Sequence, residues 1–159
     1  MKRMRELNPA YVTAAAKIVN ECPYFSLISM ELKELVWGQC RIEAKVQEKH
    51  MQPFGLVHGG IFAGLVDAAA FWAVFSEIDD GLGMTTVELK VNYLAPASKG
   101  ILIAKGRSLK VGKTICLGEA FIEDENGALL AHGTSTTMVM KDLLLQGLSQ
   151  WPRKFLYED

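Results

Sequence analysis

The residues with the clearest chemical potential are His58-Gly59-Gly60, at the beginning of a long apolar segment. Two glycines in the first turn of a helix cost about 1 kcal/mol each relative to alanine. In return, they let another molecule reach the free backbone N–H groups at the positive end of the helix. Such donors can stabilise the oxyanion that forms when a carbonyl group, for example that of a thioester, is attacked. Gly59 and Gly60 could instead serve only close packing against a strand, and the motif alone leaves both interpretations open.

Asp67 lies in the middle of the same apolar segment. A carboxylate in a buried helix must be paired, bound to water or functional. The positions three and four residues away hold Ala63, Gly64, Ala70 and Phe71, so no ion pair within the helix neutralises it. The alternative to a catalytic carboxylate is a structural one that bonds a distant backbone group or an arginine.

The spacing of these two features predicts an oligomer. Nine positions separate His58 from Asp67, which on a helix is roughly 13 Å of rise and about half a turn of rotation. One chain therefore cannot bring its own helix start and its own Asp67 to a single carbonyl group. Two antiparallel copies of the helix could do so across a twofold axis. If both features are catalytic, we expect at least a dimer with two shared sites.

Hydrophobic periodicity gives the elements that must position these residues. Asn8-Pro9 begins a helix that is expected to end near Asn20, and an irregular stretch is expected before the first strand. The apolar segment predicts a helix over about 57–78, which must be covered on most of its faces. An α+β fold follows, in which a curved antiparallel sheet of five or six strands wraps a long central helix. Alternating or apolar patterns place these strands at 30–37, 41–47, 86–93, 100–108, 113–123 and 129–140.

Composition bounds the class of protein. The chain has 159 residues and a formal net charge of −1, which suits one domain and gives no electrostatic reason to expect a nucleic acid or an anionic membrane as a partner. Three widely spaced cysteines (Cys22, Cys40 and Cys116) favour a reducing cytoplasm over a disulfide framework. No secretory signal is apparent, and Asp67 at the centre of residues 56–78 argues against a membrane span. Residues 1–25 are expected to be a helical extension and 142–159 a tail, which is either a short docked helix or part of a subunit contact.

Other chemistry finds little support in the sequence. His50 and His132 are isolated, and no spacing of His, Asp or Glu suggests a metal site. No nucleotide-binding glycine motif or GxSxG serine motif is present. Neither a metal nor a bound cofactor is therefore expected.

Residues 52–67 (QPFGLVHGGIFAGLVD) and 86–97 (TVELKVNYLAPA) together resemble the hotdog-fold thioesterases, and most of all the phenylacetyl-CoA thioesterase-like group. The resemblance covers roughly residues 26–140. It implies hydrolysis of an acyl- or aryl-CoA thioester to a free acid and CoA, in homodimers that commonly pair into tetramers. In this chain, Lys99, Arg107, Lys110 and Lys113 could meet the phosphates of CoA, although a solvated face is the commoner reason for such residues.

The same resemblance implies roles for individual residues. Asp67 matches the catalytic acid, which acts as a general base or as a nucleophile, and Gly59 and Gly60 match the oxyanion-binding helix start, with Gly59 the better match for the donor. Gln52 matches an amide that orients the water or the thioester. His58 matches a histidine that polarises the carbonyl or supports the turn. Thr86 matches a hydroxyl near the attacking water, so that Asp67 and Thr86 would come from one subunit and Gln52 and Gly59 from the other.

Two other functions remain as alternatives. A hotdog dehydratase or hydratase also pairs a histidine with an acid, but it carries different histidine-centred motifs. A non-catalytic acyl-CoA-binding sensor could share the fold, although the presence of Asp67, Gln52 and Thr86 together weighs against it. Phe62, Phe71 and Trp72 could line an acyl pocket or could be plain core. The sequence does not indicate which acyl group is preferred.

Overall fold

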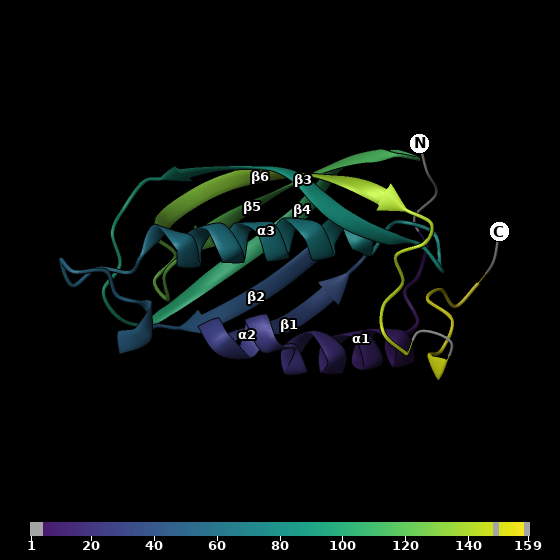
Figure 1. Cartoon of the computed structure of the whole chain (residues 1–159), viewed down its shortest axis with the longest axis horizontal. Coiled ribbons are helices and arrows are strands. Elements are labelled where there is room, and N and C mark those ends of the chain that lie inside the picture. Colours follow the sequence, from purple (N-terminus) through teal and green to yellow (C-terminus); the bar gives the residue numbers. More distant parts are fainter. Residues whose placement is uncertain (1–4, 148–149, 158–159) are drawn as a thin grey trace.

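A computed structural model describes residues 5–147 and 150–157. One six-stranded antiparallel sheet, in the order β1-β2-β4-β5-β6-β3, curves around a long central helix, α3 (Figure 1). The predicted α+β helix-in-sheet architecture is confirmed. The elements are α1 (Pro9–Glu21), α2 (Pro23–Ile28), β1 (Met30–Val36), β2 (Gln39–Lys45), a 3-10 turn η1 (Glu48–His50), α3 (Gly59–Phe75), β3 (Gly83–Tyr93), β4 (Ile101–Val111), β5 (Ile115–Glu123) and β6 (Leu129–Met140).

Glycines on the inner face of the sheet let α3 approach closely. A Cβ atom added to Gly106 on β4 would lie 2.1 Å from the Ala69 carbonyl oxygen, and one on Gly118 of β5 would lie 2.7 Å from the Ala70 carbonyl oxygen. These contacts are with helix backbone, which cannot move aside as a flexible side chain could. Ala69 and Ala70 are themselves fully buried. Small residues on both surfaces therefore hold α3 in the trough of the sheet.

Helix α3 is shorter than the 57–78 expected from its apolar run. It begins at Gly59 because His58 adopts an extended backbone and caps the first turn with its side chain. It ends at Phe75, and the hydroxyl of Ser76 donates to the Ala73 carbonyl over 2.7 Å while accepting from the Gly38 N–H over 2.7 Å. Hydrophobicity alone cannot locate these two ends because both depend on side-chain hydrogen bonds.

One face of α3 is left open, and the sheet covers its other faces, as expected. The positions on this face are exposed or half-buried, and most are small: Gly60, Ala63, Gly64, Asp67, Ala68 and Phe71. Their spacing of three and four residues places them along one side of the helix. The chain therefore leaves an accessible strip along α3 on which Asp67 lies.

The N-terminal region contains one more helix than predicted. The first helix begins as expected, with the Asn8 side chain accepting from the Ala10 N–H over 3.0 Å and Pro9 in the first turn. The irregular stretch expected after it is wrong, because Pro23 occupies the first position of a second helix, α2. Proline ends a preceding helix but is also favoured at the first position of a new one.

The C-terminal segment packs on the body of the protein, and its described residues form no α-helix. Lys154 is buried, and its Nζ donates to the carbonyls of Phe75 and Ile78 over 2.5 and 2.8 Å. A cation at these carbonyls also suits the negative end of α3. The segment thus packs against the C-terminal end of the central helix.

Among the described residues, none of the helices combines the length and the apolar character that a membrane span requires.

Candidate active site

Asp67 is held by two hydroxyl groups from the sheet. Its Oδ1 accepts from Thr86 Oγ1 on β3 over 2.9 Å and from Ser135 Oγ on β6 over 2.8 Å. The other oxygen, Oδ2, accepts no hydrogen bond from any residue that the structure describes. Nor does any described lysine, arginine or histidine form an ion pair with this carboxylate. Asp67 is therefore a half-buried, oriented carboxylate whose charge no neighbouring cation neutralises.

A β-bulge aims Thr86 at this carboxylate. Strict alternation along β3 would place Thr86 on the same face as Glu88, away from Leu89. The register instead shifts between Thr86 and Glu88, so Thr86 is opposite the buried Thr137 while Glu88 is opposite Thr136 on the outer face. The extra residue re-aims the side chain, as bulges beside functional sites commonly do. Glu88 accepts from the Thr136 hydroxyl over 3.0 Å on an exposed face.

Ser135 was not predicted as a site residue. Residues 134–137 read Thr-Ser-Thr-Thr, in which every position is polar, so periodicity does not show which hydroxyls face inward. The structure buries Ser135 and Thr137 completely. The available signal was a run of small hydroxyl residues in a strand whose earlier part is apolar, because a buried hydroxyl requires a partner.

The backbone N–H groups of the two glycines at the start of α3 differ in their hydrogen bonding. His58 Nδ1 accepts from the Gly60 N–H over 2.9 Å, so the Gly60 donor is already engaged by the cap. The Gly59 N–H has no hydrogen-bond partner within the described part of the chain. His58 is itself fixed, since its N–H donates to the His50 carbonyl over 2.8 Å. Of these two glycine amides, only that of Gly59 is left without a partner among the described residues.

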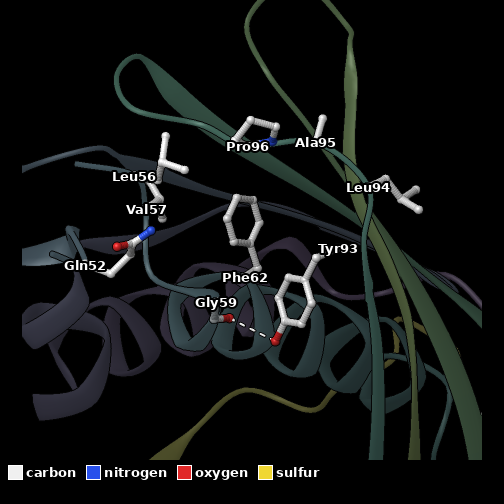
Figure 2. A pocket seen from close by; sticks show the side chains of 9 residues that line it. All are labelled: Gln52, Leu56, Val57, Gly59, Phe62, Tyr93, Leu94, Ala95 and Pro96. Atoms are coloured by element: carbon white, nitrogen blue, oxygen red, sulfur yellow. Dashed lines mark hydrogen bonds between the residues drawn. The ribbon is translucent and has the colours of Figure 1, made fainter. Parts of the chain in front are cut away.

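A cavity of about 310 Å³ lies beside Gly59 (Figure 2). Tyr93 leans over the helix start, and its hydroxyl donates to the Gly59 carbonyl over 3.2 Å. Phe62 packs edge-on against Tyr93 at 6.1 Å between ring centroids. The Gln52 side chain comes from the preceding loop, where its Oε1 accepts from the Phe54 N–H over 2.5 Å and leaves the amide NH₂ group for other partners. The lining residues are Gln52, Leu56, Val57, Gly59, Phe62, Tyr93, Leu94, Ala95 and Pro96.

The predicted site residues therefore form two groups within one chain. Asp67 and Thr86 meet near the middle of α3, whereas Gln52, His58, Gly59 and Gly60 gather at its start. Eight residues of helix, roughly 12 Å, separate Gly59 from Asp67. Asp67 does not line the cavity at the helix start. A single chain holds the two halves of the predicted site apart.

Two of the other candidates, Arg107 and Trp72, have structural surroundings. Arg107 pairs with Glu119, and Trp72 is buried in the core against Phe71 and Phe75. Phe62 is buried but borders the cavity. Among the described residues, no group of three or more His, Cys, Asp or Glu side chains is arranged to hold a metal ion.

Comparison with known proteins identifies the family. Residues 54–131 match the thioesterase superfamily model. The chain is 30% identical over 114 residues to the 1,4-dihydroxy-2-naphthoyl-CoA hydrolase of Listeria monocytogenes, covering 72% of this chain and 93% of that protein. It is 31% identical over 101 residues to human acyl-coenzyme A thioesterase 13, covering 62% and 71% of the two chains. A thioesterase of Haemophilus influenzae has a similar fold, with a TM-score of 0.79 at 20% identity over 90% of this chain and 99% of its own. The chain therefore belongs to the thioesterase superfamily, has its hotdog fold and is a hydrolase of thioesters.

Proposed function

We propose that this protein hydrolyses an acyl- or aryl-CoA thioester to a free acid and CoA, with Asp67 as the catalytic carboxylate. The observation that carries the proposal is the environment of Asp67. Two hydroxyls orient one carboxylate oxygen, and the other oxygen has no partner in the described residues. A carboxylate that is fixed, accessible and not neutralised can act as a general base or as a nucleophile. The named CoA thioesterases among its relatives support CoA as the carrier.

In the general-base form, Asp67 Oδ2 takes a proton from water as the water oxygen attacks the thioester carbonyl carbon. The carbonyl oxygen becomes an oxyanion, and collapse of this intermediate breaks the C–S bond and releases CoA as the thiolate, which then gains a proton. In the nucleophilic form, a carboxylate oxygen attacks the thioester carbonyl carbon, the C–S bond breaks and CoA leaves as the thiolate, which gains a proton. Water then hydrolyses the resulting anhydride, which releases the free acid and restores the carboxylate. CoA is part of the substrate in both forms, and we propose that no resident metal or redox cofactor takes part.

The start of α3 provides the second half of the chemistry. The Gly59 N–H is aligned with the positive end of the helix and is the donor we assign to the oxyanion. Gln52 borders the same cavity and would orient the thioester or the water through its amide group. His58 holds the turn by capping Gly60, which leaves Gly60 a structural role. Of the two candidate glycines, we therefore assign the oxyanion donor to Gly59 and not to Gly60.

We propose that two chains complete each site. The open face of α3 and the edge strand β3, which pairs only with β6, are both available to a second copy. Val87, Leu89 and Tyr93 on β3 expose apolar surface there. An antiparallel arrangement would bring Asp67 and Thr86 of one chain to Gln52 and Gly59 of the other. A homodimer is the minimum assembly, and a homotetramer of two such dimers remains the prediction.

We propose that the reaction takes place in the cytoplasm. The three cysteines form no disulfide with one another, and two of them are buried, which is compatible with a reducing cytoplasm. Substrate and a second copy of the chain are the proposed partners, with neither nucleic acid nor membrane.

Release of free thiol from a panel of acyl- and aryl-CoA thioesters tests the function, with wild type compared with Asp67→Asn. The asparagine keeps the shape of the side chain and can still accept from Thr86 and Ser135. Turnover that falls by at least about a thousandfold in a folded mutant would support the proposal. Turnover that survives the substitution would remove Asp67 from the chemistry. Binding of acyl-CoA without release would instead identify a sensor.

Gly59→Pro and Gly59→Ala form a matched pair for the oxyanion donor. Gly59 is the first residue of α3, where proline is tolerated, and His58 already has the extended backbone that precedes proline comfortably. Both variants add a Cβ atom near the Tyr93 ring, at 3.2 Å, but only proline removes the N–H. We expect kcat to fall about 100-fold more in Gly59→Pro than in Gly59→Ala. Equal losses in the two variants would exclude the amide as the donor.

Mixing Asp67→Asn with Gly59→Pro tests the shared site. In a mixed dimer, one site receives intact Asp67 from one chain and intact Gly59 from the other. After subunit exchange, we expect about a quarter of wild-type activity from two nearly inactive proteins. No recovery after verified exchange would show that each chain works alone.

A further inference from the structure

The N-terminal helix α2 reaches the open face of α3, although it lies outside the stretch that matches the thioesterase family. Figure 1 shows α2 running beside β1, below α3. A Cβ atom added to Gly64 on α3 would lie only 2.6 Å from the Tyr24 hydroxyl oxygen and 3.3 Å from Ile28 Cδ1. The phenol of Tyr24 therefore lies directly on the helix at Gly64, and it can do so only because Gly64 has no side chain.

Buried neighbours fix Tyr24 in this place. Phe25 and Ile28 anchor α2 in the core, while Tyr24 and Leu27 are 51% and 66% exposed. The Tyr24 hydroxyl has no hydrogen-bond partner in the described part of the chain. A large aromatic side chain is thus held on an accessible strip without any polar bond that would explain its position.

This strip is the one that carries Asp67. Gly64 is three residues before Asp67, so their positions are neighbours on one side of the helix, with about 5–6 Å between Cβ positions. Phe71 is four residues after Asp67, and its ring stacks on Phe75 with 6.1 Å between centroids. Asp67 therefore lies between two aromatic rings. Seven residues, roughly 10 Å of helix, separate the positions of Gly64 and Phe71.

We propose that Tyr24 is a specificity-determining residue that limits the length of the acyl group. This inference rests on the proposed function, since it takes the thioester carbonyl to be at Asp67. From there an acyl group must follow the open face of α3, where Phe71 closes one direction and Tyr24 the other. A compact or aromatic acyl group fits between the rings, with favourable ring contacts. A long chain has to displace Tyr24, whose position α2 fixes.

The test is the profile of kcat/KM against acyl length for wild type, Tyr24→Ala and Tyr24→Phe. The panel comprises acetyl-, hexanoyl-, dodecanoyl-, benzoyl- and phenylacetyl-CoA. We expect Tyr24→Ala to raise the ratio of dodecanoyl to benzoyl activity at least about tenfold, because the room gained is worth several methylene groups. Tyr24→Phe keeps the ring and should keep the profile within about twofold. Tyr24→Leu provides an intermediate volume if the alanine variant does not fold.

Leu27→Ala is the matched control, since Leu27 is on the same helix and is more exposed than Tyr24. It should leave the ratio unchanged. An unchanged profile in folded Tyr24→Ala or Tyr24→Leu would overturn the inference, as would equal shifts in Tyr24→Ala and Leu27→Ala, which would indicate general loosening of α2. The two proposals fail differently: if the wild type released no thiol from any CoA thioester, the proposed function itself would fail.

Discussion

The Ser135 hydroxyl donates to Asp67 Oδ1 over 2.8 Å, although 68 positions separate the two residues in the chain. Thr86 donates to the same oxygen, so both bonds restrain Oδ1, while Oδ2 accepts no hydrogen bond from the described residues. The central helix supplies the acid, and two strands of the sheet set its orientation. The orientation of the carboxylate therefore depends on how β3 and β6 pair, because that pairing places the two hydroxyl groups.

Ser135→Ala should lower kcat about tenfold for whichever thioester the enzyme prefers, because the carboxylate loses one of the two bonds that orient it. The protein should remain folded, since Thr86 still donates to Asp67 Oδ1. Steady-state kinetics measure the loss, and Thr136→Ala is the control. Thr136 is on the same strand but donates to Glu88 on the outer face, so its removal should leave kcat unchanged. Equal losses of kcat in the two variants would show that Ser135 supports the structure of β6 and that its bond to Asp67 has no separate effect on catalysis.

His58→Ala should destabilise the protein by about 1 kcal/mol, because the Gly60 N–H loses its cap. His58→Asn should restore most of this stability, since asparagine is a good N-cap residue. Urea unfolding measures both effects. Activity then separates the two roles implied for this histidine. Recovery in the asparagine variant would identify His58 as a support for the turn, whereas full stability without recovery would indicate that the imidazole polarises the carbonyl.

Much of the architecture follows from local sequence. Asn8-Pro9, the apolar run and the alternating strands each predict their element from side-chain chemistry within a few residues. The two elements that differ do so for local reasons as well. Pro23 ends one helix and also begins the next, and Ser76 ends α3 through a hydroxyl bond that hydrophobicity does not encode.

Most residues of the candidate site could be named from the sequence, whereas their arrangement in space could not. Asp67 and the helix-start glycines stand out because each is unfavourable in an apolar helix without a function. The partner Ser135 and the aim of Thr86 depend on strand register and on a bulge, which arise only when β3 and β6 pair. The role proposed for Tyr24 could not be predicted from the sequence, because it depends on the packing of α2 against Gly64.

The stability of the protein should decrease below about pH 6.5 because of His50. Its Nδ1 accepts from the Gln47 N–H over 3.1 Å, and its side chain is buried. Burial, and then the charge of Lys49, lowers the pKa of His50 below its ordinary value of 6.5. The unfolded chain therefore binds a proton more readily than the folded one. The contribution of neutral His50 to stability is complete above pH 6.5. It is lost as the pH falls toward the lower pKa of His50 in the folded state.

Thermal unfolding between pH 5 and 8 tests this prediction against His50→Asn. Asparagine can accept the Gln47 N–H but cannot gain a proton in this range. The wild type should lose Tm relative to the variant as the pH falls below 6.5. Parallel curves for the two proteins would rule out His50 as the source of any acid sensitivity.

Glu119→Gln should destabilise the protein at neutral pH and much less in acid. Glu119 is buried on β5, where it pairs with Arg107 and accepts a hydrogen bond from His132 Nε2 over 2.8 Å. Burial acts to raise its pKa, but the hydrogen bonds from His132 and Arg107 outweigh burial and hold the pKa below the ordinary 4.5. The ionised carboxylate thus stabilises the fold above pH 4.5, and this contribution is lost as the pH falls through the lower pKa of the folded state.

Urea unfolding at pH 7 and pH 4 measures the difference. At pH 7 the wild type should be more stable than Glu119→Gln by about 1.5–3 kcal/mol, the range for hydrogen bonds to charged groups. The gap should narrow at pH 4, because wild-type Glu119 begins to gain a proton more readily in the unfolded chain. Glu123→Gln is the control, since Glu123 pairs with the exposed Lys105 on the same face and such pairs contribute at most about 1 kcal/mol. A gap for Glu119→Gln that stays constant between the two pH values would mean that its charge does not stabilise the sheet, and that packing against Phe121 and His132 accounts for the loss.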